Sequence, residues 1–230
     1  MYSCQVPPKT SLTRTAVAER ALRIGDSEGL DAITIRRLAT ELGVTPMALY
    51  WHFKNKDELL LGLIDHVLAD VRAGRAASDP WPDQLRAMVA ALVRAMRAHP
   101  CLPDLLHAAD KKSVESFTRA TDDALGLLER AGFALDEAYW VATYLLHSAI
   151  GLVQGQPGCP PLQLPPDQIQ EWLRTQRVHL QSLSAERYPQ MVRLAETYHT
   201  LPDLDRYYAF GIDLLIGAVE KMAASRPVAS

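Results

Sequence analysis

The chain has 230 residues, with 24 Lys and Arg residues against 27 Asp and Glu residues, so its net charge of −3 excludes a general polyanion binder. No apolar run reaches the ~18–20 residues that span a bilayer, and residues 1–10 lack the apolar core of a signal peptide. The cysteines, Cys4, Cys101 and Cys159, are too few and too widely spaced for a disulfide framework or a zinc ribbon. We therefore expect a cytoplasmic protein, not bound to a membrane, with one large domain or two small ones.

The first predicted helix spans residues 12–28. Its apolar residues recur at helical spacing on one face, at Val17, Ala21, Leu22 and Ile24. Gly25 is an imperfection in this helix, because glycine disfavours a helix interior. Gly29 provides the break after it.

The next stretch, from Thr34 to Lys56, reads TIRRLATELGVTPMALYWHFKNK and predicts two short helices joined by a tight turn. Thr34 is a good N-cap for the first helix, and Gly43 suits the left-handed residue that ends it. Thr45 and Pro46 provide the N-cap and the first residue of a second helix, which is about two turns long. Such a pair places its second helix in the major groove of DNA.

Basic residues gather in this stretch although the whole chain is slightly acidic. Between Ala32 and Lys56, four basic residues stand against a single acid, Glu41. Arg36 and Arg37 lie in the first turn of their helix, where the helix dipole disfavours cations. A DNA phosphate would compensate this charge, whereas solvated surface arginines are the alternative for either residue alone.

The remaining chain shows helical periodicity without strand alternation. Asn55 and Glu58 form a capping pair for a helix to about Arg72, and the break over residues 73–80 is the predicted domain boundary. We expect an all-α protein of about ten helices: a three-helix helix-turn-helix domain over residues 1–73 and a larger helical bundle over residues 74–230. The predicted helices of the bundle span residues 81–98, 103–109, 112–131, 136–154, 167–183, 185–199 and 204–223, with a proline-rich loop at 155–166.

Two of these helices, 136–154 and 204–223, are too apolar for the surface of a monomer. Each has hydrophobic residues on more than one face, so it must be buried inside a large bundle or against a second subunit. Helix-turn-helix proteins commonly bind two half-sites as dimers. We therefore predict a homodimer on a double-stranded DNA operator that is an imperfect palindrome.

Residues 11 to about 68 resemble the N-terminal DNA-binding domain of the TetR family of bacterial transcriptional regulators. The resemblance rests on the amphipathic first helix, the Gly29 break, the Thr34 cap and above all the run LYWHFKNKDELL. The later helices, ending in YYAFGIDLLIGAVEKM, resemble the ligand-binding and dimerisation domain of the tetracycline-repressor branch. This resemblance implies a ligand-responsive repressor, which a small apolar or aromatic molecule releases from its operator.

The site residues predicted from these patterns form two groups. The DNA-binding group, in which Arg36, Arg37 and Lys56 would bind phosphates, consists of Thr34, Arg36, Arg37, Thr45, Pro46, Met47, Ala48, Tyr50, Trp51, His52 and Lys56. The effector-binding group is Met88, Met96, His107, Trp140, Tyr144, His147, Gln154 and Trp172. These residues suit an apolar cavity with a few polar groups, although each of them also fits an ordinary core position.

Metal binding and catalysis have less support. His99 and His107 stand eight residues apart, as two histidines do in the tetracycline-repressor branch, where the later one helps to bind a drug-chelated magnesium ion. Where that branch has a carboxylate for the ion, this chain has Gln154 and Gly155, so we expect no metal and no cofactor. Hydrolase, zinc-protease, P-loop and dinucleotide motifs are absent, so we expect no enzyme. The alternative is a ligand-independent helix-turn-helix architectural protein.

Overall fold

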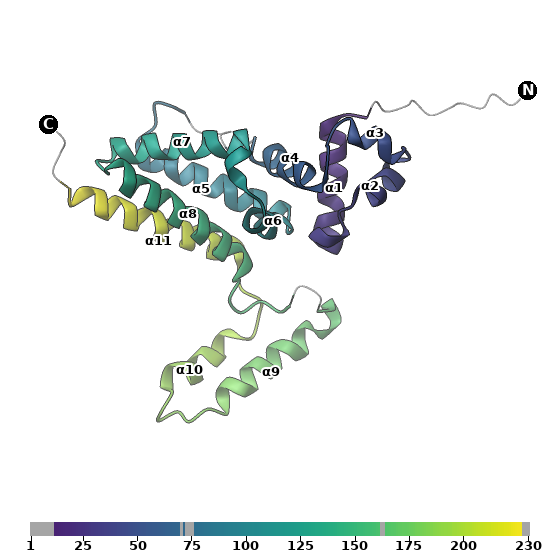
Figure 1. Cartoon of the computed structure of the whole chain (residues 1–230). Helices are drawn as coiled ribbons and strands as arrows, with labels where there is room; N and C mark the ends of the chain where they lie inside the picture. The colour runs from purple at the N-terminus through teal and green to yellow at the C-terminus, as the bar shows by residue number, and fades with distance from the viewer. Residues whose placement is uncertain (1–11, 70, 72–75, 162–163, 227–230) are drawn as a thin grey trace, which may run out of the picture. The chain divides into compact units, whose positions relative to one another are not determined.

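The computed structural model describes residues 12–69, 71, 76–161 and 164–226, and all regular elements within these ranges are helical (Figure 1). The predicted all-α class is therefore confirmed. The chain divides into two compact units, of which the first combines the described residues up to Val153 with those from Ile212 onward. The second unit runs from Gln154 to Gly211.

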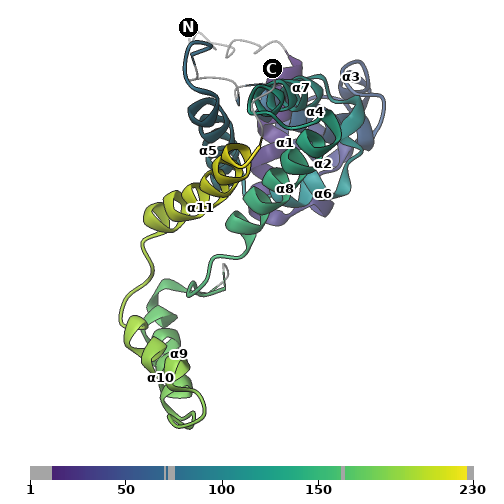
Figure 2. The same ribbon diagram turned by 90° about the vertical axis from the view of Figure 1, so that its left-hand side faces the viewer.

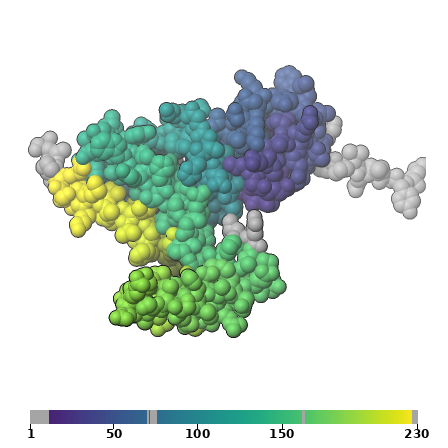
Figure 3. All heavy atoms as spheres, turned by 60° about the horizontal axis from the view of Figure 1, so that its bottom comes forward, coloured from purple at the N-terminus to yellow at the C-terminus, as the bar shows by residue number. Residues whose placement is uncertain are grey.

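The first unit begins with α1 (Arg14–Glu28), a 3-10 turn (Leu30–Ala32), α2 (Ile35–Leu42), α3 (Pro46–Tyr50) and α4 (Lys56–Leu68). Leu22, Ile33, Leu38, Leu49 and Phe53 are fully buried between these helices. Residues of α1 to α4, coloured purple to blue in Figure 3, adjoin the teal residues of the following helices. The helix predicted to reach Arg72 ends at Leu68, and Arg72 itself lies outside the described residues.

The rest of the first unit is built from α5 (Trp81–Ala98), α6 (Leu102–Ala108), a 3-10 turn (Lys111–Ser113), α7 (Glu115–Arg130), α8 (Leu135–Gln154) and α11 (Leu204–Ala224). Figures 1 and 2 label α5, α8 and α11, and two ion pairs join α11 and the residues directly after it to α5 and α8. Arg86 of α5 pairs with Asp213 of α11, and Arg226 pairs with Glu137 of α8 at 2.5 Å. These contacts hold α11 beside helices that line the cavity described below.

The second unit contains a 3-10 turn (Pro166–Gln168), α9 (Ile169–Gln181), α10 (Pro189–Leu194) and a further 3-10 turn (Ala195–Thr197). The helix predicted over residues 185–199 is shorter than expected. Pro189 has no backbone N–H and its φ is fixed, so it starts α10 at its first position and the preceding residues form a turn. None of the described helices is long and apolar enough to cross a membrane.

Gly25 has a role that the sequence periodicity did not indicate. It is buried on the side of α1 that faces the start of α6. A Cβ atom at this position would lie only 2.9 Å from the Sγ atom of Cys101 and 3.0 Å from Cδ1 of Ile33. The missing side chain therefore allows α1 to approach the start of α6 closely, and a Cβ atom there would force a neighbouring side chain to shift.

Candidate nucleic-acid interface and effector cavity

Both helices of the helix-turn-helix begin where the sequence predicts, and α2 ends at the predicted glycine, but α3 ends at Tyr50 and is shorter than the predicted two turns. The Thr34 hydroxyl oxygen accepts a hydrogen bond from the backbone N–H of Arg37 at 3.1 Å, and that of Thr45 accepts one from Ala48 at 3.3 Å. Gly43 ends α2 in the left-handed conformation, with φ 65°. Both threonine hydroxyls keep their own hydrogen as a donor, so each can also contact a phosphate oxygen.

Helix α3 carries apolar side chains that the protein core does not cover. Met47 is 68% exposed, Tyr50 47% and Trp51 87%, whereas Leu49 is fully buried and anchors the helix. Ala48 and His52 are half-buried. Three large exposed side chains on a short helix and its C-cap residue, Trp51, are unusual for a protein surface, and they suit contact with thymine methyl groups and sugars in a DNA groove.

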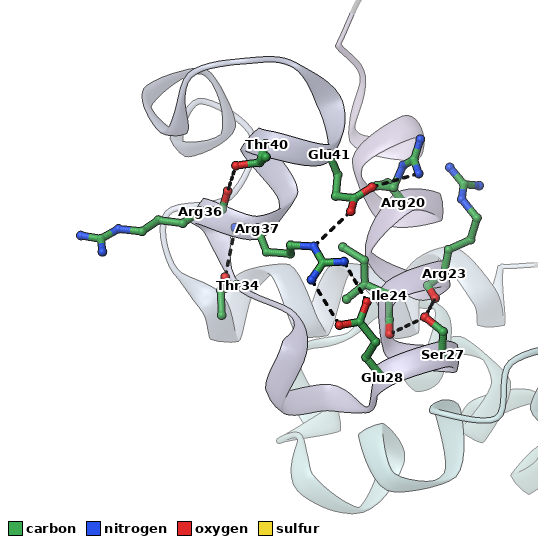
Figure 4. Close-up of polar contacts among 10 residues, drawn as sticks. All are labelled: Arg20, Arg23, Ile24, Ser27, Glu28, Thr34, Arg36, Arg37, Thr40 and Glu41. Carbon is green, nitrogen blue, oxygen red and sulfur yellow. Dashed lines mark hydrogen bonds and ion pairs between the residues drawn. The ribbon is translucent and has the colours of Figure 1, made fainter. Parts of the chain in front are cut away.

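The two adjacent arginines of α2 have different surroundings (Figure 4). Arg37 holds both carboxylate oxygens of Glu28, at 2.8 and 3.2 Å, and its Nε donates to Glu41 at 3.1 Å. These hydrogen bonds, with Glu41 as the larger contributor, raise the pKa of Arg37. Arg20 of α1 also pairs with Glu41 at 3.3 Å, so the cluster fixes α2 on α1.

Arg36, by contrast, is exposed and points away from the other residues drawn in Figure 4. Among the described residues its guanidinium has no ion-pair partner, so it remains available for a phosphate. Lys56 is intermediate between the paired Arg37 and the unpaired Arg36. It is half-buried, and its ammonium donates one hydrogen bond to the carbonyl of Leu30 at 3.3 Å. Of the three predicted phosphate-binding residues, Arg36 has the geometry best suited to that role.

A largely apolar cavity of about 320 Å³ lies within the first unit. Its walls come from the ends of α4 and α6, from the 3-10 turn at Lys111–Ser113, and from α5, α7 and α8. Leu85, Val89, Leu92, Phe117 and Leu145 are among the apolar residues that line it. A cavity of this size and character suits a small aromatic or apolar molecule.

The structure brings only two of the predicted effector-binding residues, Met88 and His147, to the wall of this cavity. His107 lies next to it, with its ring stacked on that of His147 at a centroid distance of 6.4 Å. Met96 is fully buried in the core, and the exposed rings of Trp140 (56%) and Tyr144 (73%) do not line the cavity.

The last two predicted effector-binding residues belong to the second unit. Gln154 is its first residue, and the Trp172 ring lies against that of Tyr198, with a centroid distance of 6.2 Å. Four further residues line the cavity but were not identified from the sequence: Phe117, Thr121, Lys111 and Lys112. The lysine pair could have been recognised in the sequence as two adjacent cations beside an apolar helix.

The two histidines that were considered as metal ligands have separate partners. His99 Nδ1 lies 2.9 Å from Oδ2 of Asp26, whereas His107 Nδ1 lies 3.1 Å from the carbonyl oxygen of Pro103. The described residues contain no cluster of three or more side chains that could hold a metal ion. His107 is therefore a hydrogen-bonded histidine at the end of α6, with the carbonyl of Pro103 as its partner.

Two carboxylates connect the DNA-binding helices to the ends of helices that contribute to the cavity. Asp26 of α1 accepts hydrogen bonds from the backbone N–H of Cys101, at 3.2 Å, and contacts His99. Burial, followed by the proximity of Asp26, raises the pKa of the Cys101 thiol to about 12, so it remains protonated at neutral pH. Asp65 of α4 accepts a hydrogen bond from the backbone N–H of Ser116, at 3.0 Å, and thereby caps α7.

The variant Asp65→Ala is expected to lower the free energy of unfolding by about 1 kcal/mol, the usual contribution of a helix cap. Val114, the N-cap residue of α7, makes no side-chain cap of its own, so Asp65 supplies the acceptor from α4. Asp65→Asn keeps an acceptor oxygen and should retain most of the stability. Chemical denaturation measures both values, and equal midpoints for wild type and Asp65→Ala would show that the bond contributes nothing.

Comparison with known proteins gives two matches to protein families. Residues 18–63 match the family described as bacterial regulatory proteins, tetR family, and residues 74–223 match the tetracyclin repressor-like C-terminal domain. The HTH-type transcriptional repressor DrrR1 of Streptomyces coeruleorubidus is 30% identical over 232 residues, covering 95% of this chain and 81% of the relative. The tetracycline repressor protein class C of Escherichia coli is 29% identical over 215 residues, covering 92% of each protein.

The chain is also similar to solved structures of TetR family proteins. The TetR family protein ActR of Streptomyces coelicolor in complex with actinorhodin has a TM-score of 0.74 and 28% identity, covering 93% of this chain and 99% of that one. ActR in complex with (S)-DNPA has a TM-score of 0.73 and 27% identity, with coverages of 92% and 98%. The similarity thus includes both the helix-turn-helix and the helices around the cavity.

Proposed function

Because the chain belongs to the TetR family of bacterial regulatory proteins, we propose that it acts in the cytoplasm as a homodimeric repressor, released from its operator when a small molecule enters the cavity. It is a ligand-responsive, DNA-binding transcriptional regulator, and this agrees with the main sequence-based prediction rather than with a ligand-independent architectural protein. Its relatives are regulators and not enzymes. The observation that carries the proposal is a helix-turn-helix and an apolar cavity in one chain.

The DNA contacts that we propose follow from exposure and charge. Met47 and Tyr50 of α3 and Trp51 at its C-cap face the major groove and its edges, because they are the large side chains here that the core leaves uncovered. Arg36 binds a phosphate from the start of α2. Arg37 orients α2 on α1 through Glu28 and Glu41, so its contribution to DNA binding is indirect.

The dimer that we propose pairs α8 and α11 with the same helices of a second subunit. Trp140 and Tyr144 are exposed on α8, and Phe210 (67%) and Leu214 (64%) are exposed on α11. Each helix also has a glycine with open space around it, at Gly151 and Gly217, which permits close approach of another helix. Exposed aromatic and aliphatic rows of this kind normally mark an interface between subunits.

The coupling that we propose runs from the cavity through α7 and α4 to the helix-turn-helix. Phe117 and Ala120 of α7 and Leu68 of α4 line the cavity, and the bond between Asp65 and Ser116 joins the two helices. An effector that displaces α4 would change the distance between the two recognition helices of a dimer. A ~100-fold loss of operator affinity requires about 2.7 kcal/mol of such coupling. The ligand-bound structures of ActR support a small-molecule effector.

The test of the DNA contacts compares the two arginines on an operator selected from random double-stranded DNA. Arg36→Ala is expected to reduce the slope of log K against log salt by about one unit, because one phosphate contact is lost. Arg37→Ala is expected to weaken binding without changing this slope, because its carboxylate partners are within the protein. The matched control is Arg94→Ala, an exposed arginine on α5. A wild-type slope for Arg36→Ala would refute the phosphate assignment.

A further inference from the structure

The polar groups on the cavity wall indicate what kind of molecule the cavity accepts, and this inference rests on the proposed function. Two threonines line the cavity, and both use their hydroxyl hydrogen internally. Thr121 donates to the carbonyl of Phe117 at 2.9 Å, and Thr143 donates to that of Tyr139 at 2.8 Å. Neither threonine therefore offers a free donor to a ligand, and both present methyl groups and acceptor lone pairs.

The lysine donors of the lining gather at one edge of the cavity, in the turn between α6 and α7, whereas Tyr139 and His147, which also line the cavity and can donate, belong to α8. Lys111 is half-buried in this turn, and its ammonium is positioned by a hydrogen bond to the carbonyl of Leu106 at 2.5 Å. Lys112 follows it and is exposed, and among the described residues its ammonium has no ion-pair partner. An ammonium group has three donor hydrogens and no acceptor, so even Lys111 retains two.

One acid, Asp110, stands at the same edge of the cavity. Its Oδ1 accepts the backbone N–H of Lys112 at 3.3 Å, so part of its acceptor capacity is used to cap the turn. Two ammonium groups against one carboxylate leave this edge with a net positive charge. A neutral ligand without acceptor atoms that covered this edge would separate the ammonium groups from water without replacing their hydrogen bonds to water, and a cationic ligand would be repelled.

We propose that the effector is an amphipathic anion with an apolar body and one acidic group. The body lies among the apolar side chains of α5, α7 and α8, where Leu92, Phe117 and Leu145 supply the contact surface. The acidic group lies at the edge formed by the turn between α6 and α7 and accepts hydrogen bonds from Lys111 and Lys112. Charge-assisted hydrogen bonds of this kind are roughly twice as strong as neutral ones, so the anion is selected over its neutral analogue.

A matched pair of fluorescent probes tests this inference on the full-length protein. The probes are 8-anilinonaphthalene-1-sulfonate and N-phenyl-1-naphthylamine, which share one aromatic body and differ in the sulfonate. We expect the sulfonate to bind the wild-type protein at least about tenfold more tightly, equivalent to about 1.4 kcal/mol. The double variant K111Q/K112Q should lose this difference and keep the affinity for the neutral probe. Lys221→Gln, an exposed lysine of α11 that does not line the cavity, is the control.

A variant that fills the cavity tests whether both fluorescent probes bind there. Ala124 is buried on α7 and lines the cavity, so Ala124→Phe should abolish binding of both probes, while circular dichroism reports whether the variant remains folded. The proposal is overturned if both probes bind wild type equally, if the double lysine variant keeps the preference for the sulfonate, or if folded Ala124→Phe binds both probes as wild type does. None of these outcomes affects the operator-binding test of Arg36, so a failure here leaves the regulator assignment standing.

Discussion

The variant Leu214→Glu is expected to be monomeric at micromolar concentration and to bind operator DNA at least ~100-fold more weakly than the wild-type protein. Leu214 is 64% exposed on α11 and shares a helical face with Phe210, on the side opposite the buried Ile212 and Ile216. In the proposed dimer this face is covered by the second subunit. A carboxylate there would be buried without a partner, at a cost of several kcal/mol.

The loss of operator affinity follows from the loss of one recognition helix. In a dimer the second half-site binds intramolecularly, and this connection multiplies affinity by roughly 10²–10⁴. Sedimentation velocity gives the mass, and titration of a labelled operator gives the affinity. Thr118→Glu adds one negative charge at an exposed position of α7 and should change neither value. A dimeric mass for Leu214→Glu would contradict the proposed interface.

The helix boundaries of the DNA-binding region could be predicted because their causes are local. Thr34, Gly43 and Thr45 act through bonds to residues three or four positions away, or through their own backbone conformation. The surroundings of Arg37 are different, because Glu28 lies on another helix and meets Arg37 only after α1 and α2 have packed. For this reason the sequence indicated two equivalent arginines, while the structure distinguishes them.

The cavity was harder to predict because apolar periodicity identifies faces without identifying what covers them. Helix α8 is apolar nearly all round, so Trp140 and Leu145 carry the same pattern signal. Only the fold places Leu145 at the cavity and leaves Trp140 exposed. The lysines at the cavity edge belong to a short turn between α6 and α7, and such a turn has no periodicity from which a position could be inferred.

Gly25→Ala is expected to lower the free energy of unfolding by about 1–3 kcal/mol, the usual cost of overpacking a core. At an ordinary helix position the same change would stabilise the protein by roughly 0.8–1 kcal/mol. Here the new methyl group would lie 2.9 Å from Sγ of Cys101 and 3.0 Å from Cδ1 of Ile33, and both of these side chains are buried. A loss of stability would therefore indicate a close contact between α1 and α6, whereas a gain would indicate that Gly25 only weakens the helix α1.

A double-mutant cycle tests whether the stability lost in Gly25→Ala comes from the contact with Cys101. Cys101→Ala removes the Sγ atom that the new methyl group would meet, so the double variant G25A/C101A should recover much of the stability lost in Gly25→Ala. We expect the two substitutions to be non-additive by 1 kcal/mol or more, as for side chains in direct contact. Urea denaturation of the four proteins measures this coupling. Cys101 is the N-cap residue of α6, whose Leu106 lines the cavity, so the coupling would also quantify a contact between α1 and a helix that contributes to the cavity. Strictly additive values would show that α1 does not rest on α6 as the structure places it.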